Sequence, residues 1–482
     1  MKSSVCRPRL TIAAVGSLLL SGLLSPPLAA DAIDDYVTAQ LAAGKIPGVA
    51  VLVMQDGVVV KEQGYGYANL EHKVPVTPQT IFQSASTGKQ FTAAGILLLA
   101  EDGKLGLDDS LARHFPGAPP SWQHITVRNL LTHTSGLKDY DDEFDYRRDY
   151  TDEELLAIMQ KLPLEFEPGT QWSYSNSGYL ILGLLTTRLA GKHWGDFQAE
   201  RLFIPLGMKT ARMIDEAELV PHRAAGYEVN DKGEVVNQQW ISPTFYRCAD
   251  GSLYFSIRDL AAWEKALETG TFLKPASLAA WWTPVRLANG TNYPYGFGWS
   301  LSEQRGQAVI EHSGSWAGFR AMISRYPEQR LAVMVLANSA IAEAGTMAHV
   351  IAGLVDERLR ERPSSAAPKP ADDAALAATL RGVLEAWGSS RASPAMSQAL
   401  AETASGSASE AADRRETAEW LRTARSFHLL GTDELSAAAI ALLADGSVRA
   451  VDAVLETEQH SVRYRFRIDA QGRVVGFSGK AD

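Results

Sequence analysis

Ser84-Ala85-Ser86-Thr87-Gly88-Lys89 stands directly before an apolar stretch that runs from Phe91 to Ala100. The stretch is apolar on nearly every side, which predicts a helix that is buried all round and closed by Gly103. Residues three positions apart share one helix face, so Ser86 and Lys89 are expected side by side at its N-terminus. A lysine in desolvated surroundings can help to take the proton of a serine hydroxyl, which is otherwise a poor nucleophile. On its own the S-x-x-K pattern is common and also fits the start of a surface helix.

Two further short motifs follow along the chain. Tyr174-Ser175-Asn176 begins 85 residues after Lys89 and offers a phenol that can relay a proton and an amide that can orient a carbonyl. His312-Ser313-Gly314-Ser315 ends a predicted strand, where a glycine lets a substrate backbone lie close and an amide N–H can complete an oxyanion hole. Taken alone, each motif also fits a turn.

In this order and spacing the three motifs resemble those of the S-x-x-K serine hydrolases. This family comprises class C β-lactamases, D-Ala-D-Ala carboxypeptidases, D-aminopeptidases and related esterases. Two stretches, Leu130–Leu137 (LLTHTSGL) and Gly103–Asp109 (GKLGLDD), resemble recurrent segments of the class C side of the family. The resemblance covers about residues 33–360. It implies an α/β (α+β) fold of the β-lactamase/transpeptidase type, with an antiparallel sheet flanked by helices and an α-helical subdomain.

The resemblance also implies a role for each motif. Ser86 would be the acylated nucleophile, Lys89 would assist proton transfer, and Tyr174 would act as general base and then as acid. The backbone N–H groups of Ser86 and Ser315 would form the oxyanion hole, and no metal or organic cofactor is expected. The expected substrate-binding residues are Asn176, His312, Ser313, Gly314, Ser315 and Trp316.

One departure from the family pattern bears on the substrate. The third motif begins with His312, where β-lactamases of this kind typically have the lysine of Lys-Thr-Gly. A histidine is mostly neutral at pH 7, so it favours a substrate carboxylate less than a lysine does. The sequence therefore predicts hydrolysis of an ester or a D-amino-acid peptide, with weak or no turnover of β-lactams. The alternatives are a class C-type β-lactamase and a non-catalytic penicillin-binding receptor. Loss of Ser86, Lys89 or Tyr174 would have favoured the receptor, but all three residues are present.

Other polar residues receive plainer interpretations. The acid-rich segment 139–149 could hold a metal, but a solvated loop or lid near the cleft is the favoured reading. His133 lies in the LLTHTSGL stretch and is expected to be structural. The predicted partners are a small-molecule or peptide substrate, a cell-wall peptide among them. The acidic balance argues against nucleic acid, and the oligomeric state stays open.

Residues 1–30 are typical of a secretory signal peptide. Lys2, Arg7 and Arg9 precede an apolar stretch, and small residues follow at Ala29, Ala30 and Ala32. A membrane anchor is the alternative, but the stretch is short and interrupted. We expect export to the periplasm or the medium with no lasting anchor. Removal of three basic residues and no acid changes the formal net charge from −10 to −13.

Export also removes Cys6 and leaves Cys248 as the single cysteine. No internal disulfide is then possible, so the core must hold the fold. Cys248 itself is expected to be a small buried hydrophobic residue.

The remaining chain divides at a Pro-rich segment, 361–373, predicted to be a linker. Before it, residues 31–360 should form the hydrolase domain, with a hairpin at Asp56-Gly57. After it, residues 374–482 should form a small α+β domain that caps the cleft, mediates dimerisation or binds wall polymer. The strands predicted in the first domain are Gly48–Met54, Val58–Glu62, Ala308–Glu311, Phe319–Tyr326 and Leu331–Ala337, and a helix is predicted from Thr346 to Arg360. In the second domain helices are predicted up to Phe427, and then the strands Ala439–Leu443, Ala450–Thr457, Val462–Ile468 and Val474–Phe477.

Overall fold

The computed structural model describes residues 28–140, 143–363, 374–406 and 411–481. Residues 1–27 of the predicted signal peptide, with Cys6, and residues 364–373 of the predicted linker lie outside this range. The last three signal-peptide positions fall at the start of helix α1 (Leu28–Gly44). In the part of the chain that is described, no helix is both long and apolar enough to cross a membrane.

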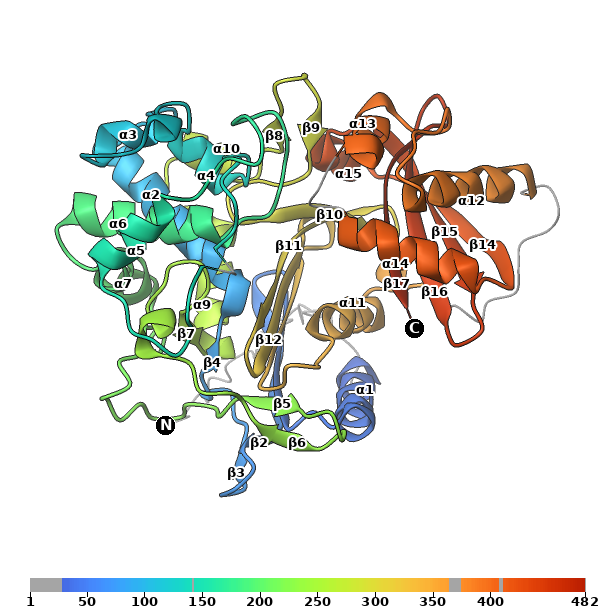
Figure 1. Ribbon diagram of the computed structural model, residues 1–482. Helices are drawn as coiled ribbons and strands as arrows, with labels where there is room; N and C mark the ends of the chain where they lie inside the picture. Colours follow the sequence, from blue (N-terminus) through green and yellow to red (C-terminus); the bar gives the residue numbers. More distant parts are fainter. Residues whose placement is uncertain (1–27, 141–142, 364–373, 407–410, 482) are drawn as a thin grey trace, which may run out of the picture.

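A seven-stranded antiparallel sheet forms the centre of the larger unit (Figure 1). The strand order is β10-β11-β12-β13-β1-β2-β3, so the first strand lies beside the last one, with Val49 opposite Ala337. The strands are β1 (Gly48–Gln55), β2 (Val58–Asn69), β3 (Val74–Pro75), β10 (Ser300–Gln304), β11 (Gln307–Trp316), β12 (Phe319–Tyr326) and β13 (Leu331–Ala337).

Alternate residues of β1 face two different hydrophobic layers. Val49, Val51 and Val53 pack with α1 and α11 (Ala344–Val355) on one face. Leu52 and Met54 join the large core between the sheet and the helical region on the other face. Every residue from Gly48 to Met54 is buried, because the strand is covered on both sides.

The predicted hairpin and strands of this sheet are confirmed, with one correction. Asp56 and Gly57 connect β1 to β2 with positive φ angles of 52° and 74°, as the tight hairpin turn requires. The correction concerns the strand predicted at Ala308–Glu311, which does not end at the third motif: β11 continues to Trp316, and Gly314 pairs with Ala321 inside it. The helix predicted to reach Arg360 ends as α11 at Val355, and a short 3-10 turn, Glu357–Leu359, follows it.

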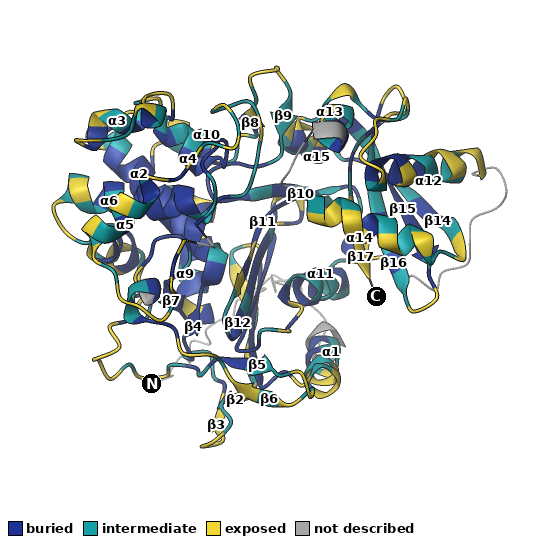
Figure 2. Cartoon of the chain, viewed as in Figure 1, coloured by how far each residue is buried: buried dark blue, intermediate teal, exposed yellow. Residues whose placement is uncertain are grey.

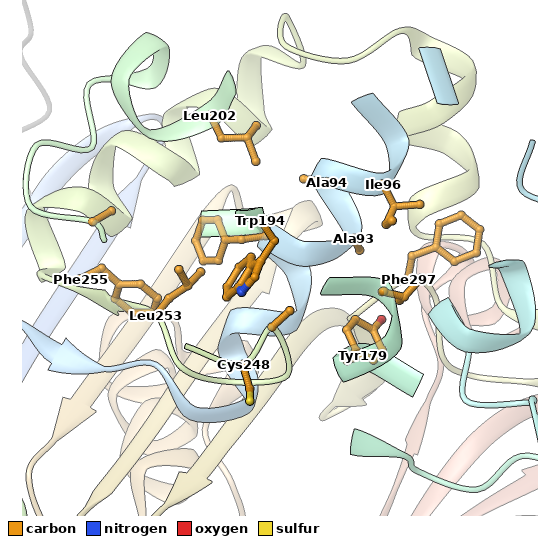
Figure 3. Packing of buried hydrophobic residues seen from close by; sticks show 14 of the residues in the cluster. Ala93, Ala94, Ile96, Tyr179, Trp194, Leu202, Cys248, Leu253, Phe255 and Phe297 are labelled. Carbon is orange, nitrogen blue, oxygen red and sulfur yellow. The ribbon is translucent and has the colours of Figure 1, made fainter. Parts of the chain in front are cut away.

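The helix predicted after the SASTGK motif is α2 (Lys89–Glu101), and its residues from Lys89 to Leu99 are all buried. Tyr179, Trp194 and Cys248 pack around it from other elements (Figure 3). Cys248 is buried in this core, as predicted. The other helices of the region are α3 (Leu111–His114), α4 (Val127–Leu131), α5 (Asp152–Met159), α6 (Asn176–Ala190), α7 (Trp194–Gln198), α8 (Ile204–Leu206), α9 (Ile257–Thr269) and α10 (Pro275–Trp281).

Three pairs of short strands complete the larger unit. Each pair forms a two-stranded sheet of its own, outside the central sheet. The pairs are β4 (Phe82–Gln83) with β7 (Tyr254–Phe255), β5 (Tyr227–Val229) with β6 (Val235–Asn237), and β8 (Val285–Arg286) with β9 (Asn292–Tyr293).

The C-terminal unit is a four-stranded antiparallel sheet with helices on it, and the outer sides of these helices are exposed (Figure 2). The strands are β14 (Ser426–Glu434), β15 (Ser447–Glu456), β16 (Ser461–Asp469) and β17 (Val474–Ala481), and the helices are α12 (Ala374–Gly388), α13 (Gln398–Gly406), α14 (Ala411–Arg422) and α15 (Ala437–Leu443).

One predicted strand of this unit, Ala439–Leu443, is wrong. The segment belongs to α15, whose N-cap Ser436 accepts a hydrogen bond from the Ala439 N–H. Alanines after a capping serine favour a helix. The strand that the prediction missed is β14, which pairs with β15.

Charged groups fasten the two units together. The Arg465 guanidinium donates to both carboxylate oxygens of Glu303 in the larger unit, at 2.5 and 2.6 Å, and to Asp452 at 2.6 Å. Arg362 and Arg305 also bind Asp433 in this interface. Apolar residues of α15 pack with Ala308 of β11 beside this network. The C-terminal unit is therefore held against the strands that carry the third motif.

Candidate active site

Ser86 sits in a strained turn just before α2. The turn is a 3-10 helix, η1 (Ala85–Gly88), and not the first turn of the α-helix that the sequence predicted. Ala85 has a φ angle of +46°, a conformation that costs free energy for a residue with a Cβ. Since a 3-10 helix has three residues per turn, Ser86 and Lys89 are brought onto the same side, as predicted.

Lys89 links the first two motifs. Its side chain is fully buried, and its Nζ donates to Ser86 Oγ at 3.2 Å, to Asn176 Oδ1 at 2.9 Å and to the Asp250 carbonyl at 2.7 Å. These three bonds use all the protons of the ammonium group. Lys89 is thus fixed beside the Ser86 hydroxyl.

Tyr174 lies on the other side of the lysine. Its ring centroid is 4.9 Å from Lys89 Nζ and 4.3 Å from the ring of His133. The hydroxyl is buried and meets no hydrogen-bond partner within the described ranges of the chain. The phenol therefore keeps its capacity to donate or accept a proton for a group that enters the site.

The amide of Asn176 is oriented by two charged neighbours. Its Oδ1 accepts from Lys89, and its Nδ2 donates to Asp139 Oδ2 at 3.1 Å. Asp139 also accepts from the backbone N–H of Ser177 at 2.7 Å, at the N-terminus of α6, where a carboxylate is favoured. Asp139 comes from the acid-rich segment predicted to be a loop, and its role as an anchor for Asn176 was not predicted.

The third motif reaches the nucleophile through Gly314. A Cβ on Gly314 would lie 2.6 Å from the Ser84 carbonyl and 3.1 Å from the Ala85 Cβ. Only glycine allows β11 to approach η1 this closely. The approach places Ser315 and Trp316 beside Ser86, where they line the same pocket.

A pocket of about 110 Å³ opens at Ser86. Of the predicted residues, Ser86, Asn176, Ser315 and Trp316 line it, whereas His312, Ser313 and Gly314 do not. The Tyr140 hydroxyl donates to the Asp250 carboxylate in the same wall. Burial raises the pKa of Asp250, and the positive charge of Lys89 opposes that rise. The complete lining is Ala85, Ser86, Tyr140, Asn176, Phe245, Cys248, Asp250, Gly251, Ser252, Ser315 and Trp316.

His312 does not take the place in the pocket that was expected of it. Both its ring nitrogens are engaged by the protein: Nε2 lies 2.9 Å from the Tyr295 hydroxyl and Nδ1 lies 2.6 Å from the Ser313 carbonyl. Burial and the nearby charge of Lys89 lower the pKa of His312 to about 4. The imidazole is therefore neutral at pH 7 and has no N–H directed at the pocket.

Two residues behind His312 were not predicted to belong to the site. Tyr295 also contacts His133 Nε2 at 3.0 Å, and His133 Nδ1 accepts from the Ser175 backbone N–H at 3.1 Å. The one sequence signal for Tyr295 is its position before Gly296 and Gly298. A Cβ on Gly298 would lie 2.8 Å from the Gln90 backbone nitrogen, so this loop packs directly on α2.

Larger hollows lie away from Ser86. One of about 580 Å³, between α5, α6 and α7, shares only Cys248 with the lining of the pocket at Ser86. Another, of about 820 Å³, lies between the two units and is lined by Trp172, Tyr293, Trp387 and Phe477 among others. No group of three or more His, Cys, Asp or Glu side chains that could hold a metal occurs among the residues described.

The sequence model of the family described as Beta-lactamase matches residues 33–356, a span that contains every residue of this site. The chain belongs to the beta-lactamase family. It is a serine hydrolase of the branch that resembles penicillin-binding proteins, as the motifs implied.

Named relatives of this family are similar over the same region. Penicillin-binding protein 4* of Bacillus subtilis is 34% identical over 307 residues, which are 60% of this chain and 67% of the relative. A D-aminopeptidase of Gluconobacter oxydans is 29% identical over 341 residues, 66% of this chain and 62% of the relative. The chain thus spans about two thirds of the length of these relatives.

Solved structures of the beta-lactamase family share the fold. The D-amino acid amidase of Ochrobactrum anthropi, complexed with L-phenylalanine amide, is 27% identical with a TM-score of 0.59, over 69% of this chain and 97% of that one. The octameric penicillin-binding protein homologue from Pyrococcus abyssi is 22% identical with a TM-score of 0.63, over 94% of this chain and 96% of that one. The second match extends the shared fold into the C-terminal unit.

Proposed function

We propose that this protein cleaves an ester or a D-amino-acid-containing peptide or amide through an acyl-enzyme on Ser86. The observation that carries the proposal is the contact of Lys89 Nζ with Ser86 Oγ at 3.2 Å and with Asn176 Oδ1 at 2.9 Å. This contact joins a nucleophile, a cation and a carbonyl-orienting amide in one site.

The proposed reaction has two halves. Ser86 Oγ attacks the substrate carbonyl as its proton passes to Tyr174, which acts as a phenolate base, while the Lys89 ammonium assists through its hydrogen bond to Ser86 Oγ. Tyr174 then gives that proton to the leaving group. The backbone N–H groups of Ser86 and Ser315 bind the oxyanion. Water then attacks the ester of Ser86 and releases the acid, with Tyr174 acting again as base.

The D-amino-acid side of the proposal is supported by two relatives. One carries the name D-aminopeptidase, and another is a D-amino acid amidase. A class C-type β-lactamase is the second candidate. It is disfavoured by His312, because a neutral imidazole whose two nitrogens are occupied offers no positive charge for the carboxylate of a β-lactam.

We also propose that the enzyme acts outside the cytoplasm. The basic, apolar and small-residue order of positions 1–30 supports export. The N-terminal sequence of protein recovered from the culture medium or the periplasm tests this, since an intact Met1 would contradict it.

A covalent probe tests the nucleophile. A fluorophosphonate should label wild-type protein once, with the added mass on the peptide that contains Ser86, and should not label Ser86→Ala. Ser121→Ala, a serine distant from the site, serves as the matched control and should be labelled like wild type. A wild type that resists the probe, or equal labelling of Ser86→Ala, would contradict the assignment. Short esters, D-Ala-D-Ala peptides and a chromogenic cephalosporin then rank the substrates.

A further inference from the structure

A line of three buried side chains runs behind the catalytic pocket. His133 Nε2 lies 3.0 Å from the Tyr295 hydroxyl, and that hydroxyl lies 2.9 Å from His312 Nε2. The three side chains come from distant parts of the chain: the end of α4, the loop before β10, and β11. His133, Tyr295 and His312 are all buried.

The position of every proton in this line is fixed from both ends. At one end the Ser175 N–H donates to His133 Nδ1, so a neutral His133 carries its proton on Nε2 and donates it to the Tyr295 oxygen. At the other end the Ser313 carbonyl can only accept, so His312 carries its proton on Nδ1. Its Nε2 then has only a lone pair, which accepts the proton of the Tyr295 hydroxyl. Both ends of the line therefore require that His133 donates to Tyr295 and Tyr295 donates to His312.

The surroundings of the imidazole favour the same state. Lys89 of α2 faces it with a positive charge, and burial and that charge together depress the pKa of His312. Tyr174 packs 6.2 Å from it between ring centroids. The hydroxyl of Tyr179 on α6 donates to the Leu131 carbonyl, and its oxygen also lies within hydrogen-bond contact of the Tyr295 hydroxyl. The neighbouring Glu311 is engaged by Ser302, Ser324 and His349.

A proton added to His312 Nε2 would break the whole line. Tyr295 would have to turn its own O–H from His312 to the Tyr179 oxygen while it accepted from two imidazoles, since His133 cannot change tautomer while the Ser175 N–H faces its Nδ1. This rearrangement costs free energy, because the hydrogen bond that Tyr295 donates to His312 is lost.

We propose that Tyr295 is a positioning residue that keeps His312 neutral and in a single tautomer, so that its Nδ1–H holds the Ser313 carbonyl and, with it, the backbone that presents the Ser315 N–H. The proposal rests on the proposed function, because the Ser315 N–H is the assumed oxyanion donor. His312 then acts on the strand and not on a substrate charge.

The test compares Tyr295→Phe with Tyr326→Phe. Tyr326 is an equally buried tyrosine that donates to Gln304 at 2.6 Å in the other core layer. Protein labelled with 15N-histidine is titrated by NMR, and the His312 signals are assigned by their loss in His312→Gln. We expect wild type and Tyr326→Phe to show the Nδ1–H tautomer, unprotonated down to pH 5. In Tyr295→Phe the neutral form loses its donor, so the midpoint of the His312 titration should move to higher pH.

Activity supplies a second readout. With a neutral ester, kcat/KM of Tyr295→Phe should fall at least tenfold more between pH 8 and pH 5.5 than that of wild type or Tyr326→Phe. An Nε2–H tautomer in wild type, or an unchanged midpoint in Tyr295→Phe, would overturn the proposal. Because the NMR readout needs no catalysis, a failed Ser86 label alone would overturn the proposed function and leave the role of Tyr295 in fixing His312 standing.

Discussion

At the scale of single residues, the most unusual group is the buried ammonium of Lys89. Its three hydrogen bonds all go to neutral atoms: a hydroxyl, an amide oxygen and a backbone carbonyl. Burial of a charge without a carboxylate in contact costs free energy, which the fold must supply from elsewhere. Such an arrangement is typical of a group kept for its chemistry.

Replacement of Lys89 should separate activity from stability. In Lys89→Met the buried charge disappears while most of the side-chain volume remains, so the free energy of unfolding should change by less than about 2 kcal/mol. The kcat/KM should fall by at least about 1,000-fold, because Ser86 loses the cation that assists its proton transfer. Steady-state kinetics and urea unfolding measure the two effects, with the exposed Lys104→Met as control. A variant that keeps a tenth of the wild-type activity would contradict the role given to Lys89.

The residues of the site were predictable where a motif marks them. Ser86, Lys89, Tyr174 and Asn176 lie in short patterns whose spacing is informative, and the structure brings them together. No such pattern surrounds the other residues of the site, which are Asp139, Asp250 and Tyr295, and none indicates the contact that His133 makes. Their proximity to the site depends on how the loops between α4, α6 and β10 pack, which no local pattern records. The residue type of His312 was enough to predict a mostly neutral side chain at pH 7. Its two hydrogen bonds were not predictable, because they depend on how distant segments pack.

At the scale of elements, β11 is the strand that connects the site to the rest of the sheet. His312 and Gly314 face the turn of Ser86, whereas Glu311 points to the opposite face. There Glu311 accepts from His349 Nε2 of α11 at 2.8 Å and from the hydroxyls of Ser302 and Ser324. This ion pair fastens α11 to the strand that carries the third motif.

The ion pair should make stability depend on pH. Glu311 and Glu361 raise the pKa of His349, so its contribution is complete below about pH 6.5 and is lost as the pH rises through the folded-state value. Despite the opposing effect of burial, His349 and the two serine hydroxyls lower the pKa of Glu311, so its contribution is present above about pH 4.5 and is lost in stronger acid. The pair therefore stabilises the fold most between about pH 4.5 and pH 6.5.

His349→Gln keeps a donor for Glu311 but cannot take up a proton. The difference in unfolding free energy between wild type and this variant should be about 1 kcal/mol larger at pH 5.5 than at pH 8.5. Urea unfolding at the two pH values measures it, and the exposed His124→Gln should show no such change. Equal differences at both pH values would argue that His349 only fills space.

Elements were predictable from sequence where burial pattern and turn chemistry agree. The β1–β2 hairpin, β12 and β13 were predicted with nearly their observed bounds. In each case a strand-like pattern of apolar residues, alternating or continuous, is bounded by residues that are typical of turns. Ala439–Leu443 was misassigned because a short apolar run fits a strand or a helix, and here the cap by Ser436 decides for the helix. The third motif was expected to end its strand because nothing local shows that Ser84 and Ala85 lie against Gly314.

At the scale of the whole molecule, the two units share a buried network of charges. Arg465 comes from β16, whose sequence alternates strictly: Val462, Tyr464, Phe466 and Ile468 face the C-terminal core, and the arginines face the other way. Glu303, its partner in the larger unit, is almost completely buried. A large hollow beside Trp172 lies in the same interface. The network makes a rigid arrangement of the units the expected behaviour.

Removal of Arg465 should loosen this arrangement. Arg465→Ala leaves the buried carboxylates of Glu303 and Asp452 without their shared partner, so the free energy of unfolding should fall by about 3–5 kcal/mol. Differential scanning calorimetry should then resolve two transitions where wild type shows one. Arg422→Ala removes an exposed pair with Glu419 in the same unit and should leave the free energy of unfolding almost unchanged. A single transition with wild-type stability in Arg465→Ala would show that apolar contacts alone hold the units together.

The position of β1 in the central sheet has a consequence for how the chain reaches this state. Val49 lies near the beginning of the chain, and its neighbour Ala337 is made only after nearly the whole larger unit. Until then, one edge of β1 has open backbone groups and an apolar surface. Contacts so distant in sequence slow folding and lengthen the time during which a nascent chain can aggregate. During synthesis from the N-terminus, β1 therefore stays unpaired on this edge until β13 has been made. A chaperone that binds β1 in this interval would protect the nascent chain from aggregation.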